Sequence, residues 1–287
     1  MDFTYGQAVI IGTIQGITEL FPISSLGHAI LVPAWLGGTF REFISSENQS
    51  YLLVTIAMHL ASSVALFLVF RKRWTRLIIG SMSAVKNRNL QSTQFRVLSY
   101  ILIATIPVGI LGLAFDDYFQ SIFGNPKFSS IFLTINGLIL VGAERLAKRD
   151  QLHELTDSDA EIDQRVNVRR SVVIGFGQSL ALFAGISRFA VTMSAGLLSK
   201  LNHSVASDFA FLLSLPVILG ASIVKLPELF TTDTNQIIGQ IILGSIVSFI
   251  CTYISVTFLV RWFKTRTLYP FAIYCLVFGI LSFVRFA

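Results

Sequence analysis

The fold is decided by residues 15–28, which read QGITELFPISSLGH and lie in the middle of an apolar region covering residues 3–38. A charged residue, Glu19, and a helix-breaking proline, Pro22, interrupt that region where a membrane helix would have its centre. Irregular backbone is tolerated at membrane depth only where protein or a polar cavity surrounds it, so we predict a broken or re-entrant helix here. The alternative is an ordinary continuous span over residues 20–40.

A second apolar region, residues 171–199, is interrupted in the same way. Gly185 and Arg188 stand near its middle, and both are unusual inside an uninterrupted membrane helix. We therefore predict a second broken helix.

The composition assigns the whole chain to the membrane. Of its 287 residues, 53% are hydrophobic and 13% are charged, and the mean hydropathy is +0.70. Soluble domains carry about 25% charged residues, so a soluble enzyme, a disordered chain and a repeat solenoid are excluded. The net charge of +6 arises from loops, which argues against nucleic acid as a partner.

Six further apolar runs are long enough to cross a bilayer. They cover residues 51–70, 97–115, 128–143, 209–224, 237–260 and 267–284. The prediction is an all-α polytopic integral membrane protein with a single membrane domain over residues 1–287.

The loops fix the expected orientation, because basic residues gather on the cytoplasmic side. Residues 71–96 contain seven basic residues and no acid, and residues 144–170 contain six basic residues. Residues 116–127 and 225–236 are poor in basic residues and are expected outside. Six crossings then leave both termini outside.

The two broken regions also suggest an internal repeat. A shift of 163 residues lays four residues of the first region, Gly12, Gln15, Ile23 and Ser24, on Gly175, Gln178, Ile186 and Ser187. Each half then consists of a broken helix pair followed by three transmembrane helices. Three is odd, so the second repeat must be inverted. Repeat 1 covers about residues 1–144, a cytoplasmic linker about 145–170, and repeat 2 about 171–287.

Ionisable residues at membrane depth mark the candidate site. Glu19 and His28 lie in the first broken region and Arg188 in the second, and such groups normally face partners or a water-filled cavity. One interpretation is a structural ion pair between Glu19 and Arg188. The hydroxyls of Ser24, Ser25 and other nearby residues favour an anion site instead.

The residue types suggest phosphate chemistry. The guanidinium of Arg188 suits phosphate oxygens. Ser24 and Ser25 could supply a hydroxyl nucleophile or further phosphate donors, and the attacking group is expected to be Ser25 or a water. His28, three residues after Ser25, lies on the same face if the chain is helical there and could transfer protons. Glu19 could orient the imidazole, act as a base or hold a divalent cation, with Gln15 as a weak metal contact. A further histidine, His59, is expected to be a packed core residue.

At these residues the chain resembles a known family, the undecaprenyl-diphosphate phosphatases of the bacitracin-resistance protein type. Residues 15–28 are similar to its first signature, and Gln178 to Leu198 to its second, which usually reads Pro-Gly-Thr-Ser-Arg-Ser-Gly. Supporting similarity covers nearly the whole chain, at residues 70–73, 103–107, 209–219 and 266–274.

The resemblance implies hydrolysis of a C55 isoprenoid diphosphate to the monophosphate that carries cell-wall precursors, an activity linked to antibiotic resistance. It implies a divalent cation, Mg²⁺ or Ca²⁺, held by Glu19 and Gln15. The expected catalytic residues are Glu19, Ser25, His28 and Arg188. Phosphate would be bound by Ser24, Gly27, Gln178, Ser187 and Arg188.

The expected partners are the polyprenyl diphosphate, membrane lipids and a second copy of the chain in a homodimer. The expected location is the bacterial inner membrane, with a site that opens to the outer face. A transporter or flippase of polyprenyl phosphate, or a phosphatase of another lipid, is the alternative.

The chain departs from the family pattern at five positions. Gln15 stands where many members have glutamate. Ala184, Ile186, Phe189 and Ala190 replace the usual proline, threonine, serine and glycine around Arg188. These changes remove two hydroxyls and are expected to put a bulky ring beside the phosphate site.

Overall fold

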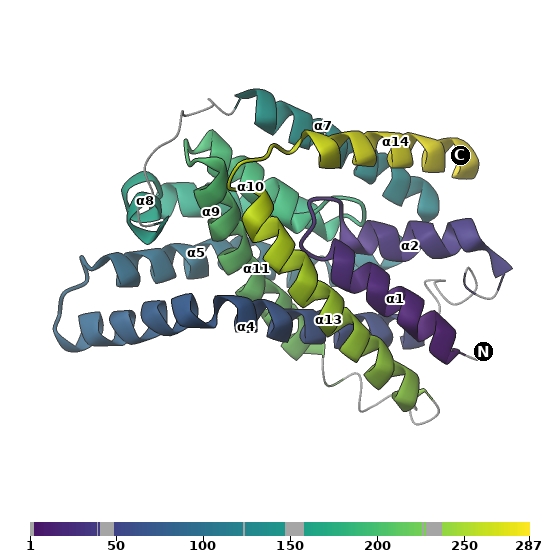
Figure 1. The fold of residues 1–287 in the computed structure, drawn as a ribbon, viewed down its shortest axis with the longest axis horizontal. Helices are drawn as coiled ribbons and strands as arrows, with labels where there is room; N and C mark the ends of the chain where they lie inside the picture. Colours follow the sequence, from purple (N-terminus) through teal and green to yellow (C-terminus); the bar gives the residue numbers. More distant parts are fainter. Residues whose placement is uncertain are drawn as a thin grey trace.

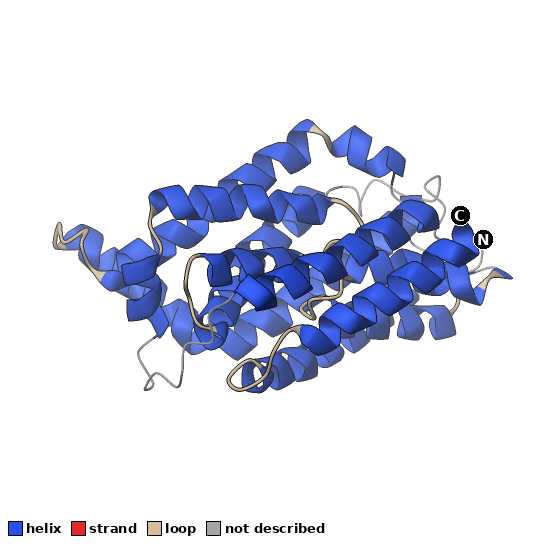
Figure 2. Cartoon of the chain, turned by 90° about the horizontal axis from the view of Figure 1, so that it is seen from above, coloured by secondary structure: helices blue, strands red, loops and turns tan. Residues whose placement is uncertain are grey.

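The computed structural model describes residues 3–38, 40, 49–122, 124–146, 158–225, 227 and 237–287. Within these ranges the chain is built from helices and contains no strand (Figure 2). The helices are α1 (Tyr5–Thr18), α2 (Ser25–Leu36), α4 (Gln49–Lys86), α5 (Thr93–Ala114), α6 (Asp116–Ile122), α7 (Pro126–Leu146), α8 (Ser158–Arg165), α9 (Val168–Gln178), the 3₁₀ turn η1 (Ser179–Leu182), α10 (Arg188–Leu198), α11 (His203–Lys225), α13 (Ile238–Trp262) and α14 (Tyr269–Phe286). The predicted all-α class is confirmed.

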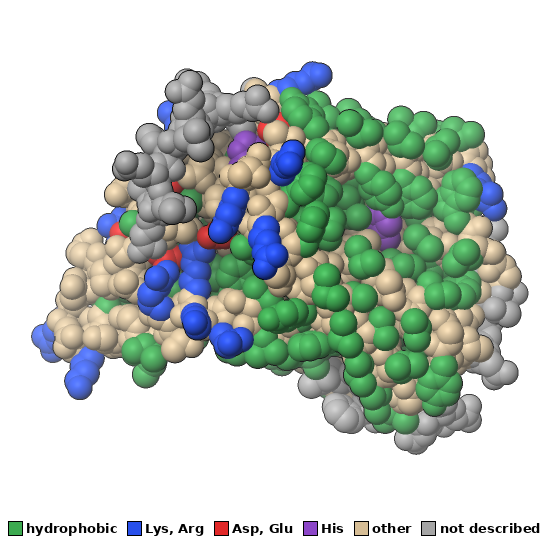
Figure 3. All heavy atoms as spheres, in the orientation of Figure 1, with side chains coloured by type: hydrophobic (Ala, Val, Ile, Leu, Met, Phe, Trp, Pro, Cys, Tyr) green, Lys and Arg blue, Asp and Glu red, His purple; other side chains and the backbone are tan. Residues whose placement is uncertain are grey.

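Six of the described helices, α4, α5, α7, α11, α13 and α14, are long and apolar enough to cross a membrane. They correspond one to one to the six predicted spans, so the chain is a multi-pass membrane protein. Apolar side chains cover much of the surface in Figure 3, whereas Lys and Arg gather mainly towards its left end. Such a belt between polar ends is what a lipid bilayer requires.

Both predicted breaks are confirmed. Helix α1 ends at Thr18 and α2 begins at Ser25, so the six residues between them, with Pro22, form a non-helical turn. The alternative of one continuous span over residues 20–40 is wrong. The second break separates the 3₁₀ turn η1 from α10, which begins at Arg188.

Each broken pair is followed in the chain by three long helices, in the order the sequence predicted. The packing between the two halves is also reciprocal (Figure 1). The first helix of each broken pair packs on the middle long helix of the other half, α1 on α13 and α9 on α5. The last long helices of the two halves, α7 and α14, pack on each other. The inversion of the second repeat and the repeat boundaries stay predictions.

The basic segment 71–96 differs from its prediction as a loop. Helix α4 continues to Lys86, since no proline interrupts residues 71–86 and Arg, Lys and Leu favour helices. The apolar helix Leu53–Lys86 has 34 residues, about 51 Å at about 1.5 Å per residue, against a bilayer core of about 30 Å. Charge marks where a helix leaves the membrane, not where it ends. The hairpin of α4 and α5 accordingly projects at the left of Figure 1, opposite the termini.

Ion pairs fasten the short helix α8 to this basic end. The guanidinium of Arg73 lies 2.6 Å from a carboxylate oxygen of Asp159 and 2.7 Å from one of Asp208 on α11. Arg76 also pairs with Asp159. Much of the expected linker and the acidic Glu228 and Asp233 of the expected outer loop lie outside the described residues.

Glycines bring α1 against α13. A Cβ atom at Gly12 would meet the carbonyl oxygen of Gly244, and one at Gly16 would meet that of Ser248. Small residues four apart on both helices let the backbones approach closely, the usual way in which membrane helices associate. Because α1 leads directly into the first turn, this contact sets the depth of Glu19.

The two turns are joined by Asn136 of α7, which is fully buried. Its side-chain amide donates to the Pro22 carbonyl at 2.8 Å and accepts from the Ser187 backbone N–H at 2.9 Å. The Ser187 hydroxyl donates to the Phe21 carbonyl at 3.2 Å. Backbone groups that the breaks leave without helical partners are thus paired across the two halves of the chain.

We expect Gly16→Ala to lower the free energy of unfolding by about 1–3 kcal/mol, because the added methyl pushes α1 away from α13. The thermal unfolding midpoint in detergent measures this change. Gly109→Ala is the matched control, since a Cβ there meets nothing within 4 Å. Equal midpoints for Gly16→Ala and the wild type would contradict the close packing.

We expect Asn136→Leu to destabilise the fold more strongly. It leaves the Ser187 N–H buried without a partner, at about 1–3 kcal/mol, and leaves the Pro22 carbonyl with only the weak Cys275 thiol at 3.8 Å. Thr134→Val on the same helix is the control, because the Thr134 hydroxyl donates within its own helix to Ser130. An Asn136→Leu protein that unfolds at the same temperature as Thr134→Val would show that the two turns do not depend on this amide.

Candidate functional site

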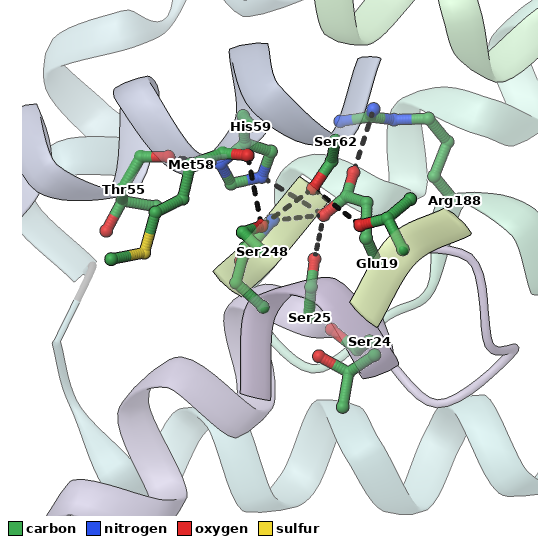
Figure 4. Close-up of polar contacts among 12 residues, drawn as sticks. Glu19, Ser24, Ser25, Thr55, Met58, His59, Ser62, Arg188 and Ser248 are labelled. Atoms are coloured by element: carbon green, nitrogen blue, oxygen red, sulfur yellow. Dashed lines mark hydrogen bonds and ion pairs between the residues drawn. The ribbon is translucent and has the colours of Figure 1, made fainter. Parts of the chain in front are cut away.

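The centre of the candidate site is the carboxylate of Glu19, in the first turn. Its Oε2 atom accepts the side-chain amide of Gln15 and the hydroxyl of Ser25, each at 2.6 Å. The Nε2 atom of His59 on α4 lies 3.3 Å from the same oxygen. Figure 4 shows the side chains of Glu19, Ser25 and His59 pointing toward one another from the first turn, α2 and α4. The carboxylate is therefore held by donors on several sides.

Arg188, the first residue of α10, faces the other carboxylate oxygen. Its Nη1 atom lies 3.8 Å from Glu19 Oε1, beyond hydrogen-bonding distance. Its buried Nε and Nη1 atoms have no hydrogen-bond partner among the described residues. A structural clamp would use these donors, so the geometry disfavours that interpretation. The guanidinium keeps donors for an anion that is not part of the chain.

The turn before Ser25 is strained and closely packed. Ser24 has φ +71°, a conformation that is unusual for a residue with a side chain. Its hydroxyl accepts the backbone N–H of Gly27 at 3.2 Å and that of Gly185 at 3.1 Å. A Cβ at Gly27 would lie 2.9 Å from the Gly185 Cα, so glycine is required at this contact.

Two helices begin at the site. Ser25 is the first residue of α2 and Arg188 is the first residue of α10. Backbone N–H groups at a helix N-terminus and the helix dipole both favour negative charge. The hydroxyl of Ser187 caps α10 by accepting the Ala190 N–H at 3.2 Å. Both helix starts add to the positive charge of Arg188.

His28 is buried and has partners on both ring nitrogens. Its Nδ1 atom lies 2.7 Å from the Ser24 carbonyl oxygen, and its Nε2 atom lies 2.8 Å from the hydroxyl of Tyr274. The ring also stacks on Tyr274 and Phe278. The structure thus places His28 behind the turn, holding the Ser24 carbonyl, and does not join it to the Ser25 hydroxyl. Its proton-transfer role stays a prediction.

The remaining predicted phosphate ligands are placed as follows. Gln178 is buried between α9 and α5, where its amide donates to the Ala104 carbonyl at 3.5 Å. The N–H of Gly27 and the hydroxyl of Ser187 are used in the turns described above. Direct phosphate contacts from these residues stay predictions.

Three contributors were missed by sequence reasoning. His59 was expected in the core, yet it also faces Glu19. Asn136 and Tyr274 were not singled out. His59 and Asn136 could have been found because each is a lone polar residue in an apolar span. Nothing in the sequence near Tyr274 distinguishes it from an ordinary interfacial tyrosine.

The bulky ring expected beside the phosphate site lies elsewhere. Phe189 is fully buried and packs against Phe211 at 4.6 Å and Phe263 at 5.5 Å between ring centroids. Along a helix, neighbouring residues point in different directions, so the residue after Arg188 turns into the core.

The site offers few ligands of its own to a metal ion. The described residues contain no group of three or more His, Cys, Asp or Glu side chains that could hold a metal. Glu19 is surrounded by the donors of Gln15, Ser25 and His59. A divalent cation here would need most of its oxygen ligands from the substrate, as Mg²⁺ does at many phosphate sites.

Comparison with known proteins identifies the family of the chain. Residues 8–281 match the family model "Bacitracin resistance protein BacA". The chain is 42% identical to an undecaprenyl-diphosphatase of Mycolicibacterium paratuberculosis, over 99% of this chain and 98% of that protein. It is 39% identical to undecaprenyl-diphosphatase 2 of Frankia alni, over 100% of this chain and 99% of that protein. The chain belongs to the BacA family of bacitracin resistance proteins.

Proposed function

We propose that this chain hydrolyses undecaprenyl diphosphate to the monophosphate and so recycles the lipid carrier of cell-wall synthesis. The observation that carries this proposal is that two buried guanidinium nitrogens of Arg188, Nε and Nη1, have no hydrogen-bond partner among the described residues, beside a serine hydroxyl bonded to a carboxylate. The first element binds a phosphate group, and the second activates a nucleophile. The identity of the lipid substrate is inferred from the relatives, which are named undecaprenyl-diphosphatases.

The geometry supports a two-step transfer. Glu19 accepts the proton of Ser25 as the serine Oγ attacks the terminal phosphorus, and the bond to the bridging oxygen breaks. Undecaprenyl monophosphate leaves, and Ser25 carries the phosphoryl group. Water then attacks that phosphorus, and Ser25 leaves with the proton that Glu19 returns. Arg188 and the starts of α2 and α10 stabilise the negative charge on phosphate throughout.

A divalent cation bound with the diphosphate would neutralise part of its charge. Glu19, with Gln15 beside it, would hold such a cation from the protein side. The serine hydroxyl and Arg188 would still orient the terminal phosphate.

The proposed location is a bacterial inner membrane. Basic residues gather at the end opposite the termini (Figures 1 and 3), so the positive-inside rule puts the termini outside. Helices α1 and α2 enter from the terminal end, which supports a site that opens outward. A homodimer is a further proposal, to be tested by the size of the detergent-solubilised protein. Lipid transport without hydrolysis is not favoured, because the relatives are diphosphatases.

The wild type should release inorganic phosphate from undecaprenyl diphosphate in detergent. Glu19→Gln should lower kcat about 100-fold or more, because the amide cannot accept the serine proton. Arg188→Met should lower kcat/KM strongly, whereas Arg71→Met, at an exposed position, should not. Absence of phosphate release from the wild type, or full activity of Glu19→Gln, would contradict the proposed function.

Removal of divalent cations tests the cofactor separately. We expect activity to fall in excess chelator and to return when Mg²⁺ or Ca²⁺ is added, since the site offers one carboxylate against a highly charged substrate. Phosphate release at the wild-type rate in chelator would show that Arg188 and the helix starts suffice.

A further inference from the structure

The side chain of His59 is locked in one orientation by its own helix. Its Nδ1 atom lies 2.8 Å from the carbonyl oxygen of Thr55, one turn earlier on α4. The atoms that face the two ring nitrogens, this carbonyl oxygen and Glu19 Oε2, are both acceptors, so each contact requires a hydrogen on the nitrogen. The contact with Thr55 fixes the plane of the ring and aims Nε2 away from α4 towards the first turn (Figure 4).

Helix α4 is in turn anchored where His59 stands. The Ser62 hydroxyl lies 3.0 Å from that of Ser248 on α13 and accepts the Thr252 hydroxyl at 2.9 Å. The Ser248 hydroxyl lies 3.2 Å from the carbonyl oxygen of Met58. These hydroxyls are buried, and hydrogen bonds between membrane helices hold their relative positions. His59 is therefore presented from a rigid element.

Glu19 is the C-cap residue of α1: its backbone N–H donates to the Gln15 carbonyl at 2.9 Å, and the Gln15 amide donates to Oε2 at 2.6 Å. Glu19 follows the last residue of α1 and belongs to the turn that contains Pro22. The direction of its carboxylate depends on the groups around it. The Ser25 hydroxyl depends on Glu19 for its own direction, and Arg188 stands too far away to hold Oε1 by a hydrogen bond.

We propose that His59 is a positioning residue for this reaction. Its Nε2 atom, 3.3 Å from Glu19 Oε2, keeps that oxygen turned towards the Ser25 hydroxyl. The proposal rests on the proposed function and extends it: the nucleophile and its base need a third group to orient the base. His59 acts through Glu19 and does not touch the lipid diphosphate. Substrate binding should therefore not depend on it.

The test compares three variants on α4. His59→Leu removes the polar contact, His59→Gln keeps a side chain of similar reach with an N–H donor, and Ser63→Ala is the matched control. The Ser63 hydroxyl donates to the Leu60 carbonyl within its own helix. Initial rates of phosphate release from undecaprenyl diphosphate give kcat and KM. The elution profile and the thermal unfolding midpoint in detergent confirm that each variant is folded.

We expect His59→Leu to lower kcat about 10- to 100-fold with KM within about 2-fold of the wild type, the range of effects seen when an orienting residue is lost. His59→Gln should recover most of that loss, and Ser63→Ala should behave as the wild type. If His59 were merely structural, His59→Leu would lower the unfolding midpoint, and His59→Gln would not restore kcat selectively.

If the wild type is active, two results would overturn the role of His59 and leave the proposed function intact. They are a His59→Leu protein with wild-type kcat, and a folded His59→Gln protein as slow as His59→Leu. A wild type that releases no phosphate overturns the proposed function and the role of His59 with it. The outcomes are therefore distinguishable.

Discussion

The contact between the two helix-breaking turns inside the membrane is the interaction on which the rest of the structure depends. A broken helix in a bilayer leaves backbone groups without partners, and each unpaired group is costly. Here each turn supplies partners to the other: Ser24 accepts from Gly185, Ser187 donates to Phe21, and Asn136 bridges both. Neither half of the chain could keep its break alone. The two helix breaks, each unfavourable alone, together form a polar interior in which their backbone groups are paired.

That interior explains why the charges are tolerated. An unpaired carboxylate at the centre of a membrane helix costs about 2.5–3.5 kcal/mol on insertion scales. Glu19 offsets part of this cost through the donors of Gln15 and Ser25, but its pairing with Arg188 is loose at 3.8 Å. A tighter, bidentate pair would occupy two of the five N–H groups of the guanidinium. The separation leaves Nη1 without a hydrogen bond to the carboxylate, as the proposed anion site requires.

Much of this arrangement was predictable from the sequence. Composition and apolar runs give the class and the six spans, and Glu19, Pro22, Gly185 and Arg188 locate the breaks, because membranes penalise such residues. The end of α4 was not predictable, since hydropathy reports the membrane boundary and not the helix end. The pairing of His28 was missed because residue spacing says which side chains share a face, not which carbonyl lies nearer. His59 and Asn136 depend on contacts between distant helices.

The departures from the family motif around Arg188 can now be placed. Phe189 turns into the core against Phe211, and Ile186 packs with Ala181 and Val191 in a small apolar cluster. Both side chains are therefore taken up by apolar packing. The motif residues that this chain retains are Gly185, whose N–H donates to Ser24, Ser187, which caps α10, and Arg188, which faces the carboxylate. The proposed anion site depends on the start of a capped helix and its arginine, so the side chains at the neighbouring positions can vary with the packing around them.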